Sequence, residues 1–537
     1  MVNLEANEIP SALLSPCSRF PGLAKWNPLP WALAVQAILL FYRLDLLEPW
    51  GDEWFTLTTV PQTLSQIRSL VEGASHPPLY FFLLHFWIQI PWPASPLSRM
   101  RAMSVLWTLL ATVVFDRLWL RELEPRVRRM VLALWVLSPC LLLYARMARS
   151  YSMQLALALL TIYAAFKWME RPQSGRWLGA YSCSSVALLY THYLPGLAIT
   201  AAVWLVFLTK PEWSLKFRLM RLAVPTLLIA FFYLPRLTSM FGAIRTWRGA
   251  STYQVGNLFV DQLVRIAYWF VSFSFGETIS VVGIVLGGLL TPFVASALYR
   301  GMRSRPRWMG LIVVASLVGY IGVSRWTGFP FTPARVLFAL PFFLIFLVEG
   351  IGASHRGSLV FAGLLVVYVS GDYSYFTKIG YLNKAYCVPY QEMAAVIVRG
   401  SPATGAVLLV DGYSSVSDPL LNRLGKGVKV ISLDDERSAE RELETLRRKP
   451  GIIWFWRHTH DTSPDKFVSR LEAELAQGRT VTRYDYLPYS MLERGILRLL
   501  RGPNQPAYFF RLLDMRLDEA GSAKSSVIAG PSKSQGH

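Results

Sequence analysis

Long apolar runs separated by clusters of arginine and lysine are the feature that most limits what this chain can fold into. A helix of roughly 20 apolar residues is long enough to cross a lipid bilayer. Dense basic clusters stand at alternate connections between the runs, at 117–129, 167–176, 210–221 and 300–307. Cytoplasmic loops of membrane proteins carry an excess of Lys and Arg. The pattern therefore predicts a polytopic α-helical membrane protein.

The apolar runs predict about eleven transmembrane helices, allowing for shorter spans whose flanking side chains reach the interface. We expect them at 28–47, 101–120, 130–144, 153–168, 177–190, 194–208, 222–234, 279–299, 308–324, 336–350 and 358–370. Two more apolar segments, 76–90 and 259–275, are expected to lie in the membrane interface, because the first is short and the second is rich in aromatic residues.

This topology makes residues 1–27 a cytoplasmic segment and 48–100 the first outer loop of a transmembrane module at 28–370. The N-terminal leader has mixed charge and no clear small-residue cleavage site, which favours a retained first span over a signal peptide. We expect a multi-pass protein of the bacterial inner (plasma) membrane, with membrane lipids around it.

Composition separates this chain from soluble and nucleic-acid-binding proteins. It is 53% hydrophobic and only 16% charged, which is too apolar for one soluble domain. The net charge of +20 arises from basic residues that mostly punctuate apolar runs, so no nucleic-acid partner is expected. The four cysteines show no CxxC spacing, which indicates neither a disulfide framework nor a zinc site.

From Gly371 the composition becomes that of a soluble domain, expected outside the cytoplasm at 371–519. Apolar strands are predicted at 406–410, 428–432 and 451–456, with helices at 435–449 and from Ser463 to Gly478. This alternation predicts a small extracytoplasmic α/β domain with a partly parallel sheet. It has no Gly-rich nucleotide fingerprint, and His458-Thr-His460-Asp461 is interpreted as a polar loop rather than a metal site. Residues 520–537 are rich in Gly, Ser and Lys and are expected to be disordered.

Charged side chains gather in the outer loops of this topology. They are Asp52, Glu53, His76, Arg146, Arg149, His192, Arg236 and Arg335. Charge at a membrane boundary costs free energy unless it is solvated or paired, which makes such residues functional candidates. A carboxylate can accept the proton of an attacking hydroxyl, and guanidinium groups can neutralise a departing phosphate. The set predicts group transfer from a phosphate-linked donor.

Several of these residues lie in motifs that resemble GT-C membrane glycosyltransferases. The first span followed by Asp52-Glu53, the segment His76-Pro77-Pro78-Leu79-Tyr80, and Arg149-Ser150-Tyr151 opening a span are similar to bacterial relatives of family 39. These relatives are the protein O-mannosyltransferases and the lipid A aminoarabinose transferases. Arg335-Val-Leu-Phe-Ala-Leu-Pro341 resembles a late element of the same family. The resemblance covers 28–350, and its most specific part is the first-loop acid with the downstream Pro-Pro-Leu-Tyr.

The resemblance implies an inverting transfer of a sugar from a polyprenyl-phosphate donor to an acceptor hydroxyl at the periplasmic face. Asp52 would match the catalytic acid of the first outer loop, with Glu53 as its neighbour in the acidic pair. Substrate-binding roles are expected of His76, Tyr80, Arg146, Arg149, Tyr151, His192 and Arg335. Relatives often carry an acidic residue shortly before the Arg-x-Tyr element, where this chain has Met147 and Ala148. A metal or acceptor role of that acid therefore does not carry over.

Structural roles compete with these functional ones. Asp52 could be a solvated loop acid, Glu53 could cap a helix or bind a cation, and His76 could cap the Pro-Pro helix start. The arginines could anchor spans at lipid headgroups, and His192 could be a packed polar residue. One acidic pair can act with or without a divalent cation, so the metal requirement stays open.

Two other classes of protein remain as alternatives. Transporters of lipid-linked glycans, including flippases, tend to have internal repeats and charges near the bilayer midplane. In this chain no repeat is evident, and the charges cluster at one surface. A non-catalytic scaffold would use the outer α/β domain to recruit partners. The sequence leaves open which sugar is moved and whether the acceptor is a lipid, a glycan or a protein.

Overall fold

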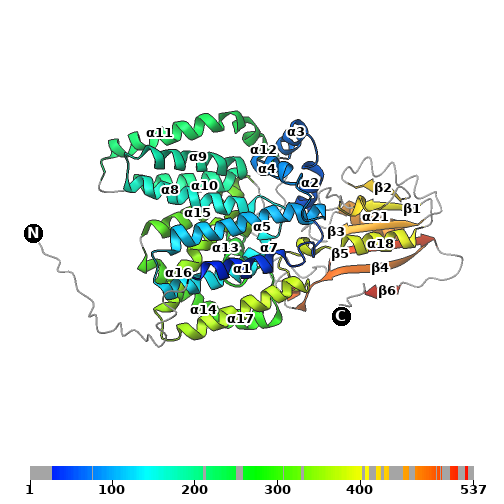
Figure 1. The fold of residues 1–537 in the computed structure, drawn as a ribbon. Helices are drawn as coiled ribbons and strands as arrows, with labels where there is room; N and C mark the ends of the chain where they lie inside the picture. The colour runs from blue at the N-terminus through cyan, green and yellow to red at the C-terminus, as the bar shows by residue number, and fades with distance from the viewer. Residues whose placement is uncertain are drawn as a thin grey trace, which may run out of the picture.

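The structure, a computed structural model, consists of a bundle of helices with a sheet domain at one end of it (Figure 1). It describes residues 27–529 except 75, 210–212, 250–257, 306, 328–331, 402–405, 411–418, 425–427, 434–451, 459–465, 492, 496–497, 499–507 and 518–525.

The long helices of the bundle lie side by side along one direction (Figure 1). They are α1 (Leu29–Phe41), α5 (Pro96–Phe115), α6 (Pro125–Val136), α7 (Pro139–Ala145), α8 (Tyr151–Glu170), α9 (Gly175–Thr191), α10 (Tyr193–Leu208), α11 (Leu215–Tyr233), α13 (Leu258–Phe275), α14 (Val281–Ser304), α15 (Arg307–Thr327), α16 (Leu340–Gly352) and α17 (Gly357–Phe376). Other elements are the π-helical turn η3 (Asp116–Leu120), the 3-10 turns η4 (Leu234–Arg236), η5 (Pro333–Ala339) and η6 (Lys384–Cys387), and the helix α12 (Leu237–Gly249).

The bundle confirms a polytopic helical membrane fold. Among the described residues, six helical segments are long and apolar enough to cross a membrane, and α6 with α7, bent by 52° at their junction, would make a seventh. Helices α1 and α10 and the part of α15 at Met309–Gly322 are apolar but shorter. Each expected span except 177–190 coincides with at least one of these helices, and 177–190 coincides with α9. The number of crossings stays a prediction, because several of the helices fall short of the usual spanning length.

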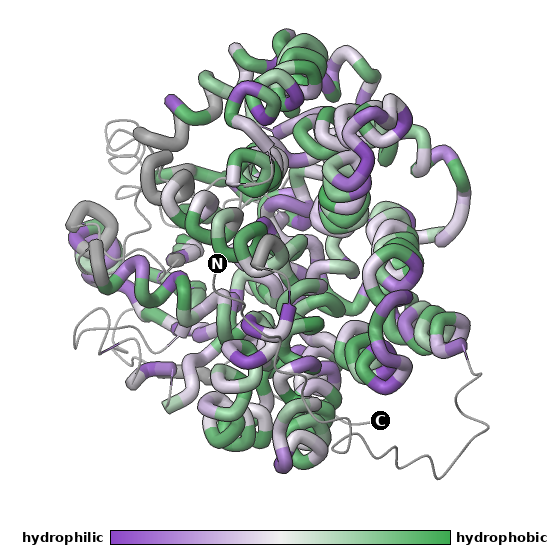
Figure 2. The backbone as a smooth tube through the Cα atoms, turned by 90° about the vertical axis from the view of Figure 1, so that its left-hand side faces the viewer, coloured by the Kyte–Doolittle hydropathy of each residue, from purple (hydrophilic) through white to green (hydrophobic). Residues whose placement is uncertain are grey.

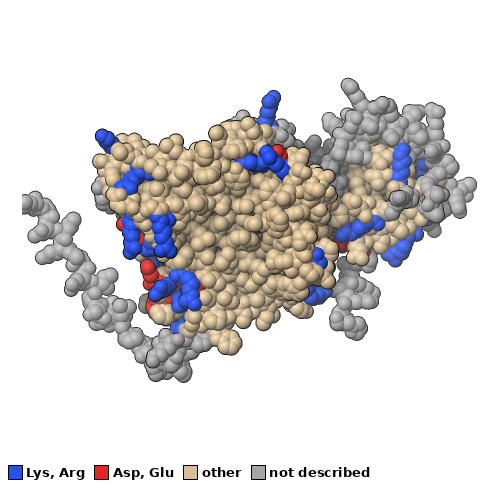
Figure 3. Space-filling view, turned by 45° about the horizontal axis from the view of Figure 1, so that its top comes forward, with Lys and Arg blue, Asp and Glu red and all other residues tan. Residues whose placement is uncertain are grey.

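The surface of the bundle has the polarity of a membrane-embedded body. Hydrophobic residues dominate the helices when they are viewed along the bundle (Figure 2). On the face drawn in Figure 3, the middle of the bundle carries few charged side chains, and basic ones gather at the end away from the sheet domain. The C-terminal ends of α5, α8 and α14 lead to exposed arginines, among them Arg117, Arg171 and Arg303.

Close helix packing accounts for two glycines on facing helices. A Cβ atom on Gly301 of α14 would lie 1.8 Å from the Phe346 carbonyl oxygen of α16. A Cβ atom on Gly350 of α16 would lie 1.8 Å from the Ala297 carbonyl oxygen of α14. Small residues let membrane helices approach this closely, and van der Waals contact then holds them together.

Three short helices of the segment 48–100, which is expected to be the first outer loop and keeps that name below, lie at the end of the bundle that faces the sheet domain (Figure 1). They are α2 (Gly51–Thr59), α3 (Leu64–Gly73) and α4 (Leu79–Trp87). Thr63 and Gln66 form a capping box that starts α3, and nine-residue α4 is too short to span, as expected of an interfacial segment. A buried apolar cluster joins these helices to α5 and α8; its members are Val60, Ile67, Val71, Tyr80, Phe81, Leu84, Met100, Met103, Ala148 and Met153.

The C-terminal domain is a six-stranded sheet with helices on both faces, in the strand order β2-β1-β3-β5-β4-β6. The strands are β1 (Ala406–Val410), β2 (Val428–Ser432), β3 (Ile453–His458), β4 (Arg479–Pro488), β5 (Tyr508–Leu517) and β6 (Ser526–Ala529). β1 pairs in parallel with β2 and β3, while β5 is antiparallel to both its neighbours, β3 and β4. The predicted partly parallel sheet is thus confirmed. Successive side chains of a strand point to opposite faces of the sheet. Leu408 and Trp456 pack with α18 (Tyr390–Gly400) on one face. Leu409 and Phe455 pack with α21 (Lys466–Ala476) on the other face.

Some expected boundaries differ from the structure. Helix α17 continues to Phe376, six residues past the expected end of the last span at 370. The expectation of disorder is wrong for Ser526–Ala529, because their backbone pairs in parallel with β4 as β6. The expected helix at 435–449 and the residues His460 and Asp461 lie outside the described part of the chain. Gly478, with φ +71°, follows α21 as predicted for a helix stop.

Candidate active site

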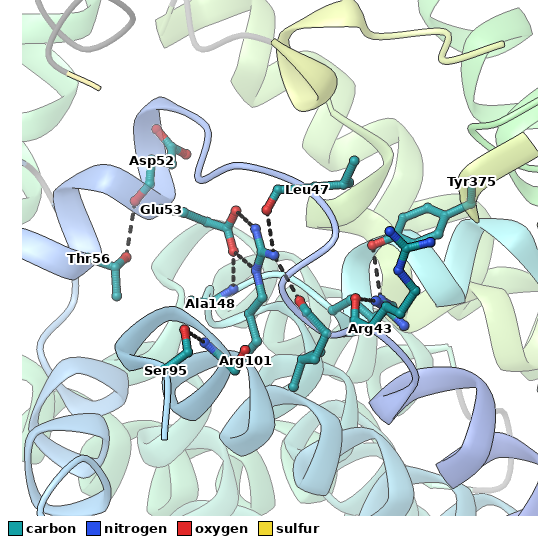
Figure 4. Close-up of polar contacts among 12 residues, drawn as sticks. Arg43, Leu47, Asp52, Glu53, Thr56, Ser95, Arg101, Ala148 and Tyr375 are labelled. Carbon is teal, nitrogen blue, oxygen red and sulfur yellow. Dashed lines mark hydrogen bonds and ion pairs between the residues drawn. The ribbon is translucent and has the colours of Figure 1, made fainter. Parts of the chain in front are cut away.

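Helix α2 presents the two acids of the first outer loop in its first turn. Asp52 and Glu53 are its second and third residues, where a negative charge interacts favourably with the helix dipole. Figure 4 shows the two carboxylates pointing apart, with Glu53 reaching toward Arg101 and Asp52 pointing away from it. Neighbours in sequence therefore have different surroundings.

Glu53 is buried and fully engaged by protein groups. Its two carboxylate oxygens accept hydrogen bonds from Arg101 Nε at 2.8 Å and Nη2 at 2.7 Å. One of them also accepts the backbone N–H of Ala148 at 2.7 Å (Figure 4). Arg101 uses its remaining nitrogen to donate to the carbonyls of Leu44 and Leu47. A carboxylate with these partners ties α2 to α5 and to the segment before α8, and it has little freedom to take a proton from a substrate.

Asp52 keeps a carboxylate that solvent can reach, with 33% of its side chain exposed. Its Oδ2 lies 3.3 Å from Arg149 Nη2. The same guanidinium donates to the Asp52 carbonyl at 3.1 Å and to Thr56 Oγ1 at 3.3 Å. Arg149 thus orients the first turn of α2 and leaves part of the Asp52 carboxylate free for a substrate.

Arg149 also lines a cavity that collects most of the predicted substrate-binding residues. The cavity encloses about 440 Å³ of empty space, including its mouth. Its wall contains His76, Pro77, Tyr80, Phe81, Arg149, Ser150, Tyr151, Thr191, His192, Tyr193 and Arg335. Six of the seven residues expected to bind substrate therefore meet here, from α4, α8, η5 and the connections before α4, before α8 and between α9 and α10.

The cavity has the polarity of an anion site. Arg149 and Arg335 bring two guanidinium groups to its wall. Arg149 Nε and His192 Nδ1 are buried and have no hydrogen-bond partner within the described residues. Buried polar atoms are rarely left unsatisfied in folded proteins, so these two atoms point to a ligand that completes them.

The two histidines of the cavity favour the neutral form. Burial, followed by the charges of Arg149 and Arg335, holds the pKa of His76 well below its usual range. Burial, followed by Arg335 and His76, does the same to the pKa of His192. The ring of His76 stacks on Phe81, and its Nε2 lies 3.4 Å from Arg149 Nη2. No side chain caps α4, so the alternative role of His76 as a helix cap is not observed.

Arg146 is the exception among the predicted substrate-binding residues. It is 1% exposed and donates to the carbonyls of Leu39, Leu40, Tyr42 and Arg43 at the end of α1. Its Nε donates to the Tyr375 hydroxyl at 3.0 Å. The last carbonyls of a helix lack partners within the helix, and a guanidinium can supply them. Arg146 therefore caps the end of α1 and is not among the residues that line the cavity.

A second, smaller cavity adjoins the first and shares His76, Pro77 and Tyr193 with it. It encloses about 250 Å³ of empty space and is also lined by Glu72, Tyr233, Arg236, Ser239 and Met240. Glu72 of α3 forms an ion pair with Arg236 of η4 across this cavity. The pair ties the first outer loop to the end of α11.

Sequence reasoning missed Arg101, the partner of Glu53, and Tyr193, which lines both cavities. A usable signal exists for Arg101. It stands at the end of an apolar run that the topology places outside, against the bias that puts the dense arginine clusters at the cytoplasmic ends. No comparable signal marks Tyr193.

The structure also bears on whether the candidate site can hold a metal ion. Within the described part of the chain, no three His, Cys, Asp or Glu side chains gather in a group that could hold a metal ion. Glu53 is occupied by Arg101 and Ala148, so the acidic pair does not form a two-carboxylate site.

Comparison with known proteins identifies the architecture. No protein-family model matches the chain, and no curated protein matches its sequence. Among solved structures, ArnT from Cupriavidus metallidurans in the apo state matches with a TM-score of 0.51 and 12% sequence identity, over 90% of this chain and 97% of ArnT. The chain has the GT-C fold.

Two further solved structures resemble this GT-C chain at lower TM-scores. ArnT from Cupriavidus metallidurans bound to undecaprenyl phosphate matches with a TM-score of 0.49 and 12% identity, over 92% of this chain and 99% of ArnT. The Archaeoglobus fulgidus oligosaccharyltransferase in complex with Zn and sulfate matches with a TM-score of 0.43 and 11% identity, over 87% of this chain and 72% of that one. The expected GT-C fold is confirmed at the level of architecture by the match to ArnT in the apo state.

Proposed function

We propose that the protein is an inverting glycosyltransferase that moves a sugar from a polyprenyl-phosphate donor to an acceptor hydroxyl. One observation carries the proposal: Arg149 pairs with the accessible carboxylate of Asp52 and at the same time lines a buried basic cavity with Arg335. A candidate base and a candidate phosphate site therefore share one guanidinium. This is the arrangement needed when a hydroxyl attacks a carbon that is losing a phosphate.

The reaction is a single displacement. The acceptor oxygen forms a bond to the anomeric carbon while the bond from that carbon to the phosphate oxygen breaks. Asp52 takes the acceptor proton. The bonding electrons leave with the phosphate, and the product lipid is the polyprenyl phosphate. Attack from the side opposite the leaving group inverts the anomeric configuration.

The cavity residues divide the work of binding the phosphate. Arg149 and Arg335 neutralise the charge that develops on the leaving oxygen, in a site where burial strengthens electrostatic interactions. Neutral His76 and His192 can each donate one N–H without competing for a proton, and Tyr80 and Tyr151 line the same wall. Glu53 holds α2 in place through Arg101, and Arg146 holds the end of α1.

The donor class follows from this chemistry together with the fold. ArnT, whose apo form shares the architecture, is also known in a crystal structure bound to undecaprenyl phosphate, so a polyprenyl phosphate is the first ligand to test. Reaction on the extracytoplasmic side of a bacterial inner membrane would suit the basic residues at the opposite end of the bundle. The C-terminal domain would then be extracytoplasmic and the N-terminus cytoplasmic.

Replacement of the proposed base tests the assignment. Purified protein is given polyprenyl-phosphate glycolipids extracted from cells that lack it, and release of free polyprenyl phosphate is followed with and without a cell-envelope extract as acceptor. We expect release with the wild type and none with Asp52→Asn at equal protein level and equal thermal stability. Undiminished release by Asp52→Asn would overturn the role of Asp52, and no release by the wild type would favour a transporter of lipid-linked glycans.

A further inference from the structure

The C-terminal domain contacts the stretch of chain that carries Asp52. Glu48, four residues before Asp52, accepts the backbone N–H of Gln391 at 3.0 and 3.1 Å, in the first turns of α18. Arg423 from the same domain pairs with Glu48 at 3.1 Å. Both partners of this pair are more than two-thirds buried. A carboxylate of the loop is therefore bound twice by the sheet domain.

Contacts on the two sides of Asp52 extend this connection. The guanidinium of Arg423 lies 5.6 Å from the ring centroid of Trp54, which follows the acidic pair. Trp50, which precedes it, packs edge-on against Tyr386 of η6 with the ring centroids 5.0 Å apart. A cation over an aromatic face and an edge-on aromatic pair both add to the attraction from buried area. Arg423 of the sheet domain thus touches α2 directly after its two acids, whereas Tyr386, which packs with the core of the bundle, contacts Trp50 before them.

The membrane domain holds the same helix from the other side. Glu53 is bound by Arg101 of α5 and by the N–H of Ala148, as Figure 4 shows. Figure 1 places α2 at the junction of the bundle and the sheet domain. Asp52 therefore stands on a short helix that is fixed between two parts of the protein, and its carboxylate, paired with Arg149, is the more exposed acid of the pair.

We propose that Glu48 and Arg423 are positioning residues through which the C-terminal domain sets the place of Asp52. The proposal rests on the proposed function, because it takes Asp52 as the base. It assigns the sheet domain a direct part in the rate of transfer, with no contact to the substrate. Loss of the Arg423 contacts frees the first turn of α2 on one side, while the phosphate-binding cavity, built from α4, α8, η5 and the neighbouring connections, keeps its residues.

Arg423→Ala is the informative variant, because the side chain comes from the sheet domain and is not part of the cavity. A base displaced by about 1 Å costs roughly 10- to 100-fold in rate. We expect kcat to fall by that factor and the affinity for undecaprenyl phosphate alone to stay within about twofold of the wild type. Arg423→Lys keeps a cation for Glu48 and Trp54 and should recover most of the rate. Glu48→Gln keeps an acceptor for the Gln391 N–H, so its kcat should lie between those of Arg423→Ala and Arg423→Lys.

Arg511→Ala provides the matched control. Arg511 makes a bidentate pair with Asp485 inside the sheet, at 2.6 and 2.9 Å. A general loss of domain stability would slow both variants, whereas positioning slows Arg423→Ala alone. Equal kcat for Arg423→Ala and the wild type would overturn the proposal, as would an equal loss of kcat in Arg511→Ala. A proposal about Asp52 fails separately, if Asp52→Asn retains transfer.

Discussion

Arg149 Nη2 lies 3.3 Å from the Asp52 carboxylate and 3.4 Å from the His76 ring nitrogen, so one guanidinium connects the accessible acid to the wall of the basic cavity. A phosphate that binds Arg149 would arrive within reach of the carboxylate. The distance between base and leaving group is then set by one side chain, and that side chain is fixed in turn by the carbonyl of Asp52 and the hydroxyl of Thr56.

The two cavity arginines should differ in their effect. Arg149→Ala removes a phosphate ligand and the partner of Asp52, so we expect kcat to fall by about 100-fold or more. Arg335→Ala removes a cation from the cavity wall but leaves Asp52 in place, so the weaker affinity for the donor should dominate. Steady-state kinetics, together with measured binding of undecaprenyl phosphate, separate the loss of kcat from the loss of donor affinity. Arg68→Ala, an exposed arginine of the same outer loop, is the control and should match the wild type.

The buried pair of Glu53 and Arg101 should matter for stability more than for chemistry. Breaking a buried ion pair by removal of one partner costs about 3–5 kcal/mol, because the other charge stays buried without compensation. Glu53→Ala should therefore lower the unfolding temperature in detergent markedly. Replacing both residues by apolar ones, as Glu53→Leu with Arg101→Met, should recover part of that loss. If Glu53→Ala unfolds like the wild type yet loses all transfer, Glu53 acts in catalysis after all.

The neutral histidine of the cavity predicts how stability depends on pH. His76 has a pKa well below the value of about 6.5 that it takes in an unfolded chain. Below that pH the unfolded state binds a proton that the folded state resists, so His76 lowers the stability of the fold as the pH falls from about 6.5. We expect His76→Gln to lose less stability than the wild type between about pH 7 and pH 5. His355→Gln, at an exposed position, should follow the wild-type curve; coinciding curves for all three proteins would contradict the prediction.

The contact between α14 and α16 should not tolerate a methyl group. Gly301→Ala and Gly350→Ala would each drive a Cβ atom into a backbone carbonyl of the facing helix, so both should unfold at lower temperature than the wild type. Gly288→Ala is matched to them, since Gly288 lies on the same helix α14 and has no atom within 4 Å of the added Cβ. Alanine is the better helix former, so Gly288→Ala should leave the unfolding temperature equal or higher. A common loss in all three variants would mean that the helices do not pack as described.

The sequence predicts the helical segments well, because a run of apolar residues defines a membrane helix from its own composition. The strands at 406–410 and 428–432 were likewise predictable from short apolar runs bounded by polar segments. The same reasoning could not separate Arg146 from Arg149. They lie three residues apart on the same connection, yet one meets the carbonyls of α1 and the other meets Asp52.

Long-range partners explain the remaining differences. Glu53 and Asp52 are alike in sequence, and only the arrival of Arg101 from α5, 48 residues later in the chain, makes one of them a fixed anchor. The strand β6 depends on a pairing with β4, more than 40 residues earlier, which the polar composition of the tail does not reveal. Local sequence patterns determine where helices and strands form, whereas the roles of charged residues depend on which helices and strands come into contact.

The two adjoining cavities share His76, Pro77 and Tyr193 in their walls. A molecule bound in one cavity would therefore contact the same imidazole and phenol rings as a molecule bound in the other. Occupants of the two cavities would sense each other through direct displacement of these rings, without any change in the surrounding helices. An enzyme with two substrates and this arrangement would show affinities for donor and acceptor that depend on each other. The three shared side chains would then determine the order in which the substrates bind.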